Sequence, residues 1–307
     1  MPPRPADPSA PPPRPLVGVL WMFAAGLSFV GVTGIVRYLG TDLPAAQSAF
    51  LRFAWGAAFL VPVLVPLLLQ GLPPGVAGPA LWRGAAHTVA VVCWFYAMAR
   101  LPVAEVTAIG YLNPVLVTLG AALFFGERLA ARRLAAIAVA LIGALVILRP
   151  GLREVLPGHL AQLGAAAAFA ASYLLAKRLS ALIPAGTVVA LMSLTVTVAL
   201  APLALAVWVP VGVEPVLWLG LVAAFATFGH YAMQRAIGAA PLSVTQPVTF
   251  LQLVWATLLG LAVFGEAVDP FVLAGGAIII AAVSYITWRE ARLRRRPVTP
   301  AVNALKG

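Results

Sequence analysis

Long apolar runs separated by short polar breaks make up almost the whole chain. A helix needs about 20 apolar residues to cross a bilayer, and most of these runs reach or approach that length. The breaks contain Pro, Gly and charged residues, as in QGLPPGVAGP and LRPGLREVLPGH, and such clusters end helices. The pattern predicts an all-α membrane protein of ten transmembrane helices, at 16–36, 45–69, 81–99, 103–125, 134–148, 160–176, 185–209, 214–234, 242–264 and 271–288.

The second half of the chain repeats the first half. Residues 102–135 and 241–274 align at an offset of 139, and the FGE of the first copy recurs in the second. An internal duplication in a hydrophobic chain is typical of secondary transporters, whose binding site lies between the two halves. Five helices per copy is an odd number, so the second copy must enter the membrane upside down. The sequence therefore predicts two inverted five-helix repeats.

The placement of Lys and Arg predicts the orientation, because cytoplasmic loops carry an excess of these residues. With both termini in the cytoplasm, fifteen of the twenty Lys and Arg residues lie inside and one, Arg52, lies within a span. The remaining four lie outside: Arg37, Arg100, Arg149 and Arg153. We therefore expect a multi-pass protein of the cell inner membrane with both termini cytoplasmic.

Composition excludes a water-soluble protein. Charged residues make up 9% of the chain and apolar residues 62%, against a soluble norm of about 25% charged. The net charge of +11 does not indicate a nucleic-acid partner, because the cations lie between apolar runs or in the tail. We expect the basic tail, 289–307, to lie in the cytoplasm beside anionic membrane lipid. The Pro-rich start, 1–15, is expected to be a disordered tail.

The segment WFYAMARLPVAEVTAIGYLNPVLVTLGAALFFGERL, its weaker copy ending in FGEAV and the ten-helix duplication resemble the EamA family of the drug/metabolite transporter superfamily. The resemblance implies EamA repeats at 16–150 (helices 1–5) and 158–288 (helices 6–10), arranged as a basket around a central cavity. It also implies transport of small organic metabolites. Family members include exporters of amino acids and related compounds, and importers of S-adenosylmethionine or riboflavin. The second copy has Val244 in place of Glu105, so the two halves are chemically unequal.

Arg52 is the first candidate for solute binding, because it lies about eight residues into the second run. A charge at mid-membrane costs roughly 2.5–3.5 kcal/mol on insertion scales, so this side chain should face a cavity or a partner. In a cavity, its guanidinium could hold a carboxylate or phosphate with two hydrogen bonds. Alternatively, Arg52 forms a structural ion pair with Glu105 at the outer start of the fourth helix.

Uncharged polar residues on the fourth and ninth helices form a second candidate set. Thr245, Thr249 and Gln252 follow i, i+4, i+7 spacing, which places them on one helix face. Asn113 is the repeat equivalent of Gln252, and Pro114 beside it predicts a kink. The set could line a cavity for a solute with amide, hydroxyl or amine groups, or it could make hydrogen bonds between helices.

Histidine and aromatic residues complete the candidate site. His87 and His230 could each relay protons, or each could be a neutral, hydrogen-bonded histidine of the core. Aromatic side chains could stack on a planar or cationic solute, or simply pack. The proposed substrate-binding set is Arg52, Trp55, His87, Tyr111, Asn113, Thr245, Thr249, Gln252 and Trp255. Residues at helix ends and at the kink are expected to be structural or gating: Glu105, Pro114, Gly126, Glu127, Gly265 and Glu266.

The sequence favours a secondary active transporter that moves a small organic metabolite, such as an amino acid or amino-acid derivative, by alternating access. It contains no GxxxxGK[ST] loop, so we expect a proton or solute gradient rather than ATP as the energy source. It contains neither HExxH nor GxSxG, so we expect no enzyme, no metal site and no cofactor. An intramembrane enzyme or a non-transporting scaffold is the alternative, and proton coupling and a homodimer are left open.

Overall fold

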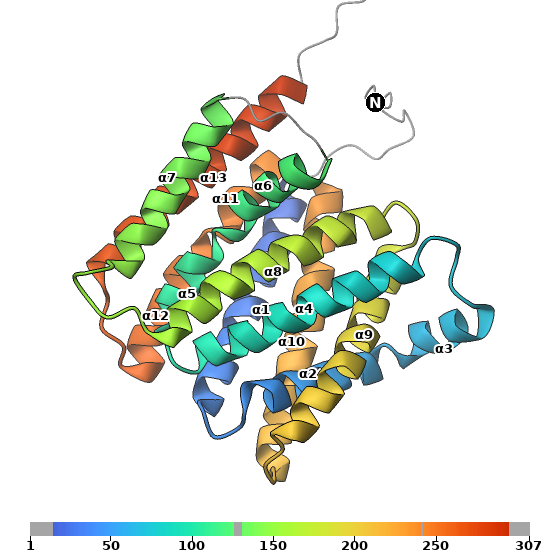
Figure 1. The fold of residues 1–307 in the computed structure, drawn as a ribbon. Coiled ribbons are helices and arrows are strands. Elements are labelled where there is room, and N and C mark those ends of the chain that lie inside the picture. Colours follow the sequence, from blue (N-terminus) through green and yellow to red (C-terminus); the bar gives the residue numbers. More distant parts are fainter. Residues whose placement is uncertain (1–14, 126–130, 241, 295–307) are drawn as a thin grey trace, which may run out of the picture.

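The computed structural model describes residues 15–125, 131–240 and 242–294 (Figure 1); both tails, Gly126 and Glu127 lie outside these ranges. The described residues form thirteen α-helices and no β-strand. In chain order the helices are α1 (Pro15–Leu39), α2 (Ala45–Phe59), α3 (Val61–Gln70), α4 (Ala77–Met98), α5 (Val103–Gly110), α6 (Asn113–Phe125), α7 (Ala131–Leu148), α8 (Pro157–Leu179), α9 (Ala185–Ala206), α10 (Val213–Ala239), α11 (Leu242–Thr249), α12 (Leu251–Phe264) and α13 (Pro270–Arg294).

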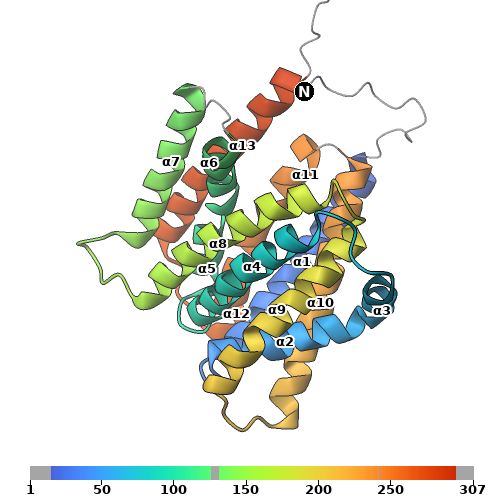
Figure 2. The ribbon, with the colours of Figure 1, turned by 45° about the vertical axis from the view of Figure 1, so that its right-hand side comes forward.

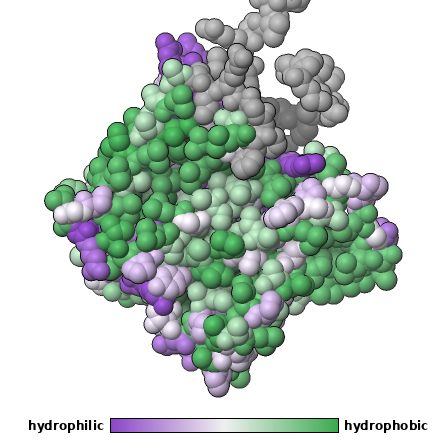
Figure 3. All heavy atoms as spheres, in the orientation of Figure 1, coloured by the Kyte–Doolittle hydropathy of each residue, from purple (hydrophilic) through white to green (hydrophobic). Residues whose placement is uncertain are grey.

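The length and apolar character of these helices make the chain a multi-pass membrane protein. Among the described residues, eight candidate spans are long and apolar enough to cross a membrane, and the bent pair α2–α3 would make a ninth. Helix α4 has 22 residues, but Arg83, His87 and Thr88 lower its mean hydropathy. Figure 3 shows apolar side chains over most of the visible face, with hydrophilic ones gathered toward the lower-left and upper edges.

The run at 45–69 is bent rather than continuous. Helices α2 and α3 meet at an angle of 74°, and the bend lies just before Pro62, whose ring and missing N–H disfavour a continuous helix. The equivalent segment of the second half, α9, continues for 22 residues. The two halves therefore differ in shape at this position.

The runs at 103–125 and 242–264 are each broken near their middle. The kink expected at Asn113 and Pro114 is a break in the structure, because α5 ends at Gly110 and α6 begins at Asn113, with two residues between them. Pro114 sits in the first turn of α6, where its missing N–H costs least. The second run breaks at Phe250, between α11 and α12. The two breaks fall at equivalent positions of the duplicated sequence.

Contacts between opposite halves of the chain hold the bundle together. Helix α1 packs along α10, and α4 packs along α8. The pair α7 and α13 lies on one side of the bundle, and α2 packs against α9 on the other (Figures 1 and 2). Each of these pairs joins a helix of the first half to a helix of the second.

Two glycines set the distance between α7 and α13. A Cβ added to Gly143 would lie 2.8 Å from the carbonyl oxygen of Gly275, and one added to Gly275 would lie 2.5 Å from that of Gly143. Small residues allow membrane helices to approach until their backbones touch. A larger side chain at either position requires the two helices to separate.

Candidate functional site

A cavity with a volume of about 340 Å³ lies inside the bundle. Its walls come from α1, α2, α4, α5 and α6 of the first half and from α8, α10, α11 and α12 of the second. Small-molecule sites usually have volumes of about 300–1,000 Å³. The cavity therefore has the size of a metabolite site and is shared between the halves.

The two helix breaks meet at this cavity. Tyr111 lies between α5 and α6, and its ring contacts that of Phe250 edge to face, with centroids 5.5 Å apart. The Tyr111 hydroxyl donates to the carbonyl oxygens of Thr249, at 3.3 Å, and Phe250, at 3.4 Å. Irregular backbone at membrane depth is tolerated where it is buried in protein or lines a cavity. Discontinuous helices of this kind build substrate sites in transporters.

Arg52 lines the cavity from the middle of α2. Its guanidinium carbon lies 3.8 Å from the ring centroid of Phe53, a stacking distance. Within the described part of the chain Arg52 forms no ion pair. The alternative interpretation, a pair with Glu105, is therefore wrong, because that carboxylate is bound by Arg153 and His159.

Other polar side chains at the cavity are held by neighbouring helices. His87 Nδ1 lies 3.0 Å from the hydroxyl of Ser172 on α8. Asn113 donates from Nδ2 to a backbone oxygen of α8 at 3.2 Å, and Gln162 donates from Nε2 to a backbone oxygen of α5 at 2.9 Å. Both amides line the cavity, and Gln162 Oε1 has no hydrogen-bond partner among the described residues. Asn113 therefore joins two helices and also borders the cavity.

Aromatic rings form much of the apolar wall. His87 contacts Phe53 and Phe169 edge to face, with centroids 5.7 and 5.1 Å apart, and His230 contacts Phe29 at 5.2 Å. The other aromatic residues on the wall are Trp94, Phe95, Tyr111 and Tyr173. Such faces suit a planar solute.

Two tryptophans of the expected set do not line the cavity. Trp55 points toward α10, where its Nε1 donates to the carbonyl oxygen of Val216 at 3.2 Å. Trp255 packs edge to face against Phe23, with centroids 6.0 Å apart. Both have packing roles, which a single sequence cannot distinguish from solute stacking.

The polar stripe expected on the ninth helix is only partly present. Thr249 and Gln252 line the cavity, whereas Thr245 is fully buried away from it. The i, i+4, i+7 argument assumes one continuous helix, and the break at Phe250 interrupts the helical register. Thr245 and Thr249 therefore lie on one helix, α11, whereas Gln252 lies beyond the break on α12.

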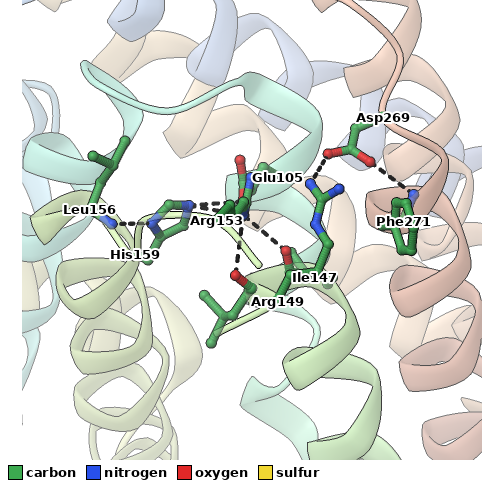
Figure 4. A network of polar contacts seen from close by, with 9 residues as sticks. Glu105, Ile147, Arg149, Arg153, Leu156, His159, Asp269 and Phe271 are labelled. Carbon is green, nitrogen blue, oxygen red and sulfur yellow. Dashed lines mark hydrogen bonds and ion pairs between the residues drawn. The ribbon is translucent and has the colours of Figure 1, made fainter. Parts of the chain in front are cut away.

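Glu105 lies in a buried polar cluster at the start of α5 (Figure 4). Arg153 donates to its Oε1, and His159 Nε2 lies 2.9 Å from the same oxygen. His159 Nδ1 accepts a hydrogen bond from the backbone N–H of Leu156 at 2.9 Å. This contact assigns the ring proton to Nε2, and the Nε2–H group donates a hydrogen bond to Glu105. This cluster ties α5 to the linker before α8 and to α8 itself.

Glu266 makes a comparable connection after α12. Its Oε1 accepts from Arg37 Nε at 2.9 Å, and its Oε2 accepts from the backbone N–H of Val103 at 2.9 Å. Gly265 before it has a φ of 64°, in the left-handed region that glycine adopts freely. The turn allows one carboxylate to join the ends of α1, α5 and α12.

Ion pairs gather at this one end of the bundle. Arg149 at the end of α7 pairs with Asp269 before α13, beside the Glu105 cluster (Figure 4). The Arg37–Glu266 and Arg149–Asp269 pairs join the first half to the second half. The Arg153–Glu105 pair joins the first half to the linker before α8. These pairs lie at the end of the bundle that the Lys and Arg pattern predicts to be external.

From the sequence alone we missed several residues of the cavity and of the end where the ion pairs gather. His159 and Arg153 lie in the break LRPGLREVLPGH, where charge alone gives no partner. Gln162 was overlooked in an alanine-rich run, although a lone amide in an apolar helix is a signal of interhelical contact. Phe53 directly follows Arg52, but only the structure shows the stacking.

Comparisons with known proteins agree with this architecture. The model of the EamA-like transporter family matches residues 16–149 and 156–288. A riboflavin transporter of Rhizobium johnstonii is 31% identical over 292 residues, covering 93% of this chain and 96% of the relative. A riboflavin transporter of Vibrio cholerae is 30% identical, covering 92% and 97%. A solved crystal structure at 21% identity has a TM-score of 0.58 over 90% of this chain and 98% of its own, a likeness of fold. The chain belongs to the EamA-like transporter family, which makes it a transporter rather than an enzyme.

Proposed function

We propose that this protein is a secondary active transporter that moves riboflavin, or a metabolite with a similarly planar polar ring system, by alternating access. The observation that carries the proposal is the chemistry of the cavity wall. Aromatic side chains such as Trp94 and Tyr173 share the wall with the amides of Asn113, Gln162 and Gln252. A fused polar ring needs apolar surfaces for its faces and hydrogen-bonding groups for its edge.

The riboflavin transporters similar to this chain support the same solute class. Amino acids, which the sequence also suggested, have less support from the cavity. Its described wall contains no Asp or Glu that could hold an α-ammonium group. A solute without a cationic group therefore fits this wall better than a zwitterion does.

The pairing of helices supports an inverted repeat of ten membrane segments. Exchanging the halves turns α1 into α8 and α10 into α4, so the α1–α10 contact becomes the α4–α8 contact. The α7–α13 and α2–α9 contacts each map onto themselves. Any two-fold relation between the halves produces this pattern, and the odd number of segments per half favours an axis in the membrane plane. Inverted repeats support alternating access by exchanging the conformations of the two halves. We place the protein in the inner membrane with both termini cytoplasmic and a proton or solute gradient as energy source.

Counterflow of labelled riboflavin into proteoliposomes tests the proposal. Purified protein should exchange external labelled riboflavin for internal unlabelled riboflavin, and excess S-adenosylmethionine or amino acids should not compete. Gly26 lines the cavity, and a Cβ added there meets no atom within 4 Å, so Gly26→Trp should fill the cavity and stop exchange.

The matched control is Gly186→Trp. A Cβ at this glycine also meets no atom within 4 Å, but the position lies at the start of α9, outside the cavity. It should leave exchange unchanged. Folded wild-type protein without riboflavin counterflow, or a Gly26→Trp variant as active as wild type, would contradict the proposal.

A further inference from the structure

Arg52 is the part of the cavity that riboflavin does not explain, because riboflavin carries no net charge at neutral pH. No Asp or Glu appears among the described residues of the wall, so Arg52 is the one formal charge that they contribute. A guanidinium has five N–H donors and is always protonated. An unpaired charge in a water-poor site is costly unless an opposite charge compensates it.

The guanidinium is held ready to bind. Its carbon lies 3.8 Å from the ring centroid of Phe53, and Phe53 is itself only 1% exposed. Stacking occupies one face of the guanidinium and leaves the N–H groups along its edge available. Those donors form the planar fork that matches a carboxylate or phosphate.

We propose that Arg52 selects the charge of the transported solute: its guanidinium holds a phosphate or carboxylate of an anionic planar metabolite and repels cations. This inference rests on one part of the proposed function, namely that the solute binds in this cavity during transport. It narrows the solute from a planar ring to a planar ring with an anionic group. Flavin mononucleotide is such a solute, and it differs from riboflavin by one phosphate.

A charge series of naphthalene compounds tests the inference without assuming a flavin. The compounds are 1-naphthoate, 1-naphthalenemethanol and 1-naphthylmethylammonium, which have the same ring and charges of −1, 0 and +1. Binding to purified protein in nanodiscs is measured by calorimetry, alongside riboflavin and flavin mononucleotide. We expect wild type to bind the naphthoate at least tenfold more tightly than the alcohol, and the ammonium compound most weakly.

The variants separate charge from shape. Arg52→Met should bind the naphthoate and the alcohol equally and should gain affinity for the ammonium compound. Arg52→Lys keeps the charge but loses the fork, so it should retain part of the preference. The control is Arg100→Met, because Arg100 follows α4, its guanidinium contacts Tyr96 of that helix, and it does not line the cavity. It removes the same charge outside the cavity and should bind as wild type does.

The outcomes distinguish this inference from the proposed function. Equal binding of naphthoate and alcohol by wild type, or an unchanged preference in folded Arg52→Met, overturns the charge selection even if riboflavin is transported. A naphthoate preference that depends on Arg52, without binding of either flavin, supports the charge selection and overturns the flavin assignment. Tighter binding of flavin mononucleotide than of riboflavin, lost in Arg52→Met, supports both.

Discussion

The Glu105 side chain is 3% exposed, and its partners Arg153 and His159 are 26% and 1% exposed. A carboxylate at this depth is stable because a guanidinium and an imidazole N–H both donate to it. The pair is asymmetric, since Arg153 reaches water and Glu105 does not. Removing the acid therefore leaves a partly hydrated cation, whereas removing Arg153 leaves a buried anion.

We expect Glu105→Gln to lower stability by about 3 kcal/mol, the low end for removing one partner of a buried ion pair, because Arg153 reaches water. The measurement is thermal unfolding of the purified protein in detergent. Glu154→Gln is the control, because Glu154 is an exposed acid next to Arg153 in the linker before α8. An equal unfolding temperature for both variants would show that the cluster contributes no stability.

At this scale the sequence predicted residue types better than residue partners. Arg52, Tyr111 and Asn113 were identified because polar groups in apolar runs are costly and need an explanation. The partner of Glu105 was not predictable, because Arg153 and His159 lie 48 and 54 residues away. A single sequence does not show which of the external cations comes closest.

Helix contacts depend on individual small residues, and α7–α13 is the clearest example. Gly275→Val should separate the two helices, because even a Cβ at this position meets the Gly143 carbonyl oxygen at 2.5 Å. We expect a lower unfolding temperature and a loss of transport, since core overpacking costs about 1–3 kcal/mol or more. Gly78→Val is the comparison, because a Cβ there meets no atom within 4 Å. An equal fall in unfolding temperature and transport in both variants would mean that valine destabilises any helix here, and that the contact between α7 and α13 is not the cause.

The positions of the helices were largely predictable, and their continuity was not. Each expected run contains a helix or a pair of helices, because apolar length alone indicates a membrane segment. A kink was predicted from Pro114, and the structure has a break just before that proline. The break at Phe250 has Pro247 upstream, but a proline inside a membrane helix often only bends it. The break places Thr249 and Gln252 on separate helices, which the regular spacing of the two residues did not predict.

At the scale of the whole molecule, ion pairs join the helices at one end of the bundle. If this end opens during transport, the Arg37–Glu266 contact must break. Glu266→Gln should weaken it and raise the fraction of molecules open at this end. The readout is labelling of Met98→Cys, a cavity residue, by a membrane-impermeant maleimide in a Cys93→Ala background.

We expect faster labelling from the external side in Glu266→Gln than in the otherwise identical protein with Glu266. Glu214→Gln is the control, because among the described residues Glu214 accepts a hydrogen bond from Trp218 of its own helix and makes no polar contact with another helix end. Unchanged labelling in Glu266→Gln would mean that this contact does not hold the external end closed.

Topology is the second prediction for the whole molecule. Reporter fusions after Gly307 and after Asp269 should lie on opposite sides of the membrane, because α13 is a candidate span between them. Alkaline phosphatase activity after Asp269 and fluorescence of a green fluorescent protein after Gly307 measure the two sides. Both reporters on one side would contradict the inverted repeat.

The bend between α2 and α3 has a consequence for the lipid around the protein. Helix α2 has 15 residues, which span about 22 Å, less than the roughly 30 Å of a bilayer's hydrocarbon core. Helix α3 turns away by 74°, and Leu64 is its one buried residue. Where α2 follows the bilayer normal, α3 adds little height, so acyl chains must cover its sides and the bilayer must thin beside it. Shorter acyl chains reduce that deformation, and membrane thickness therefore becomes a variable that tunes this half of the transporter separately from the half built on the unbroken α9.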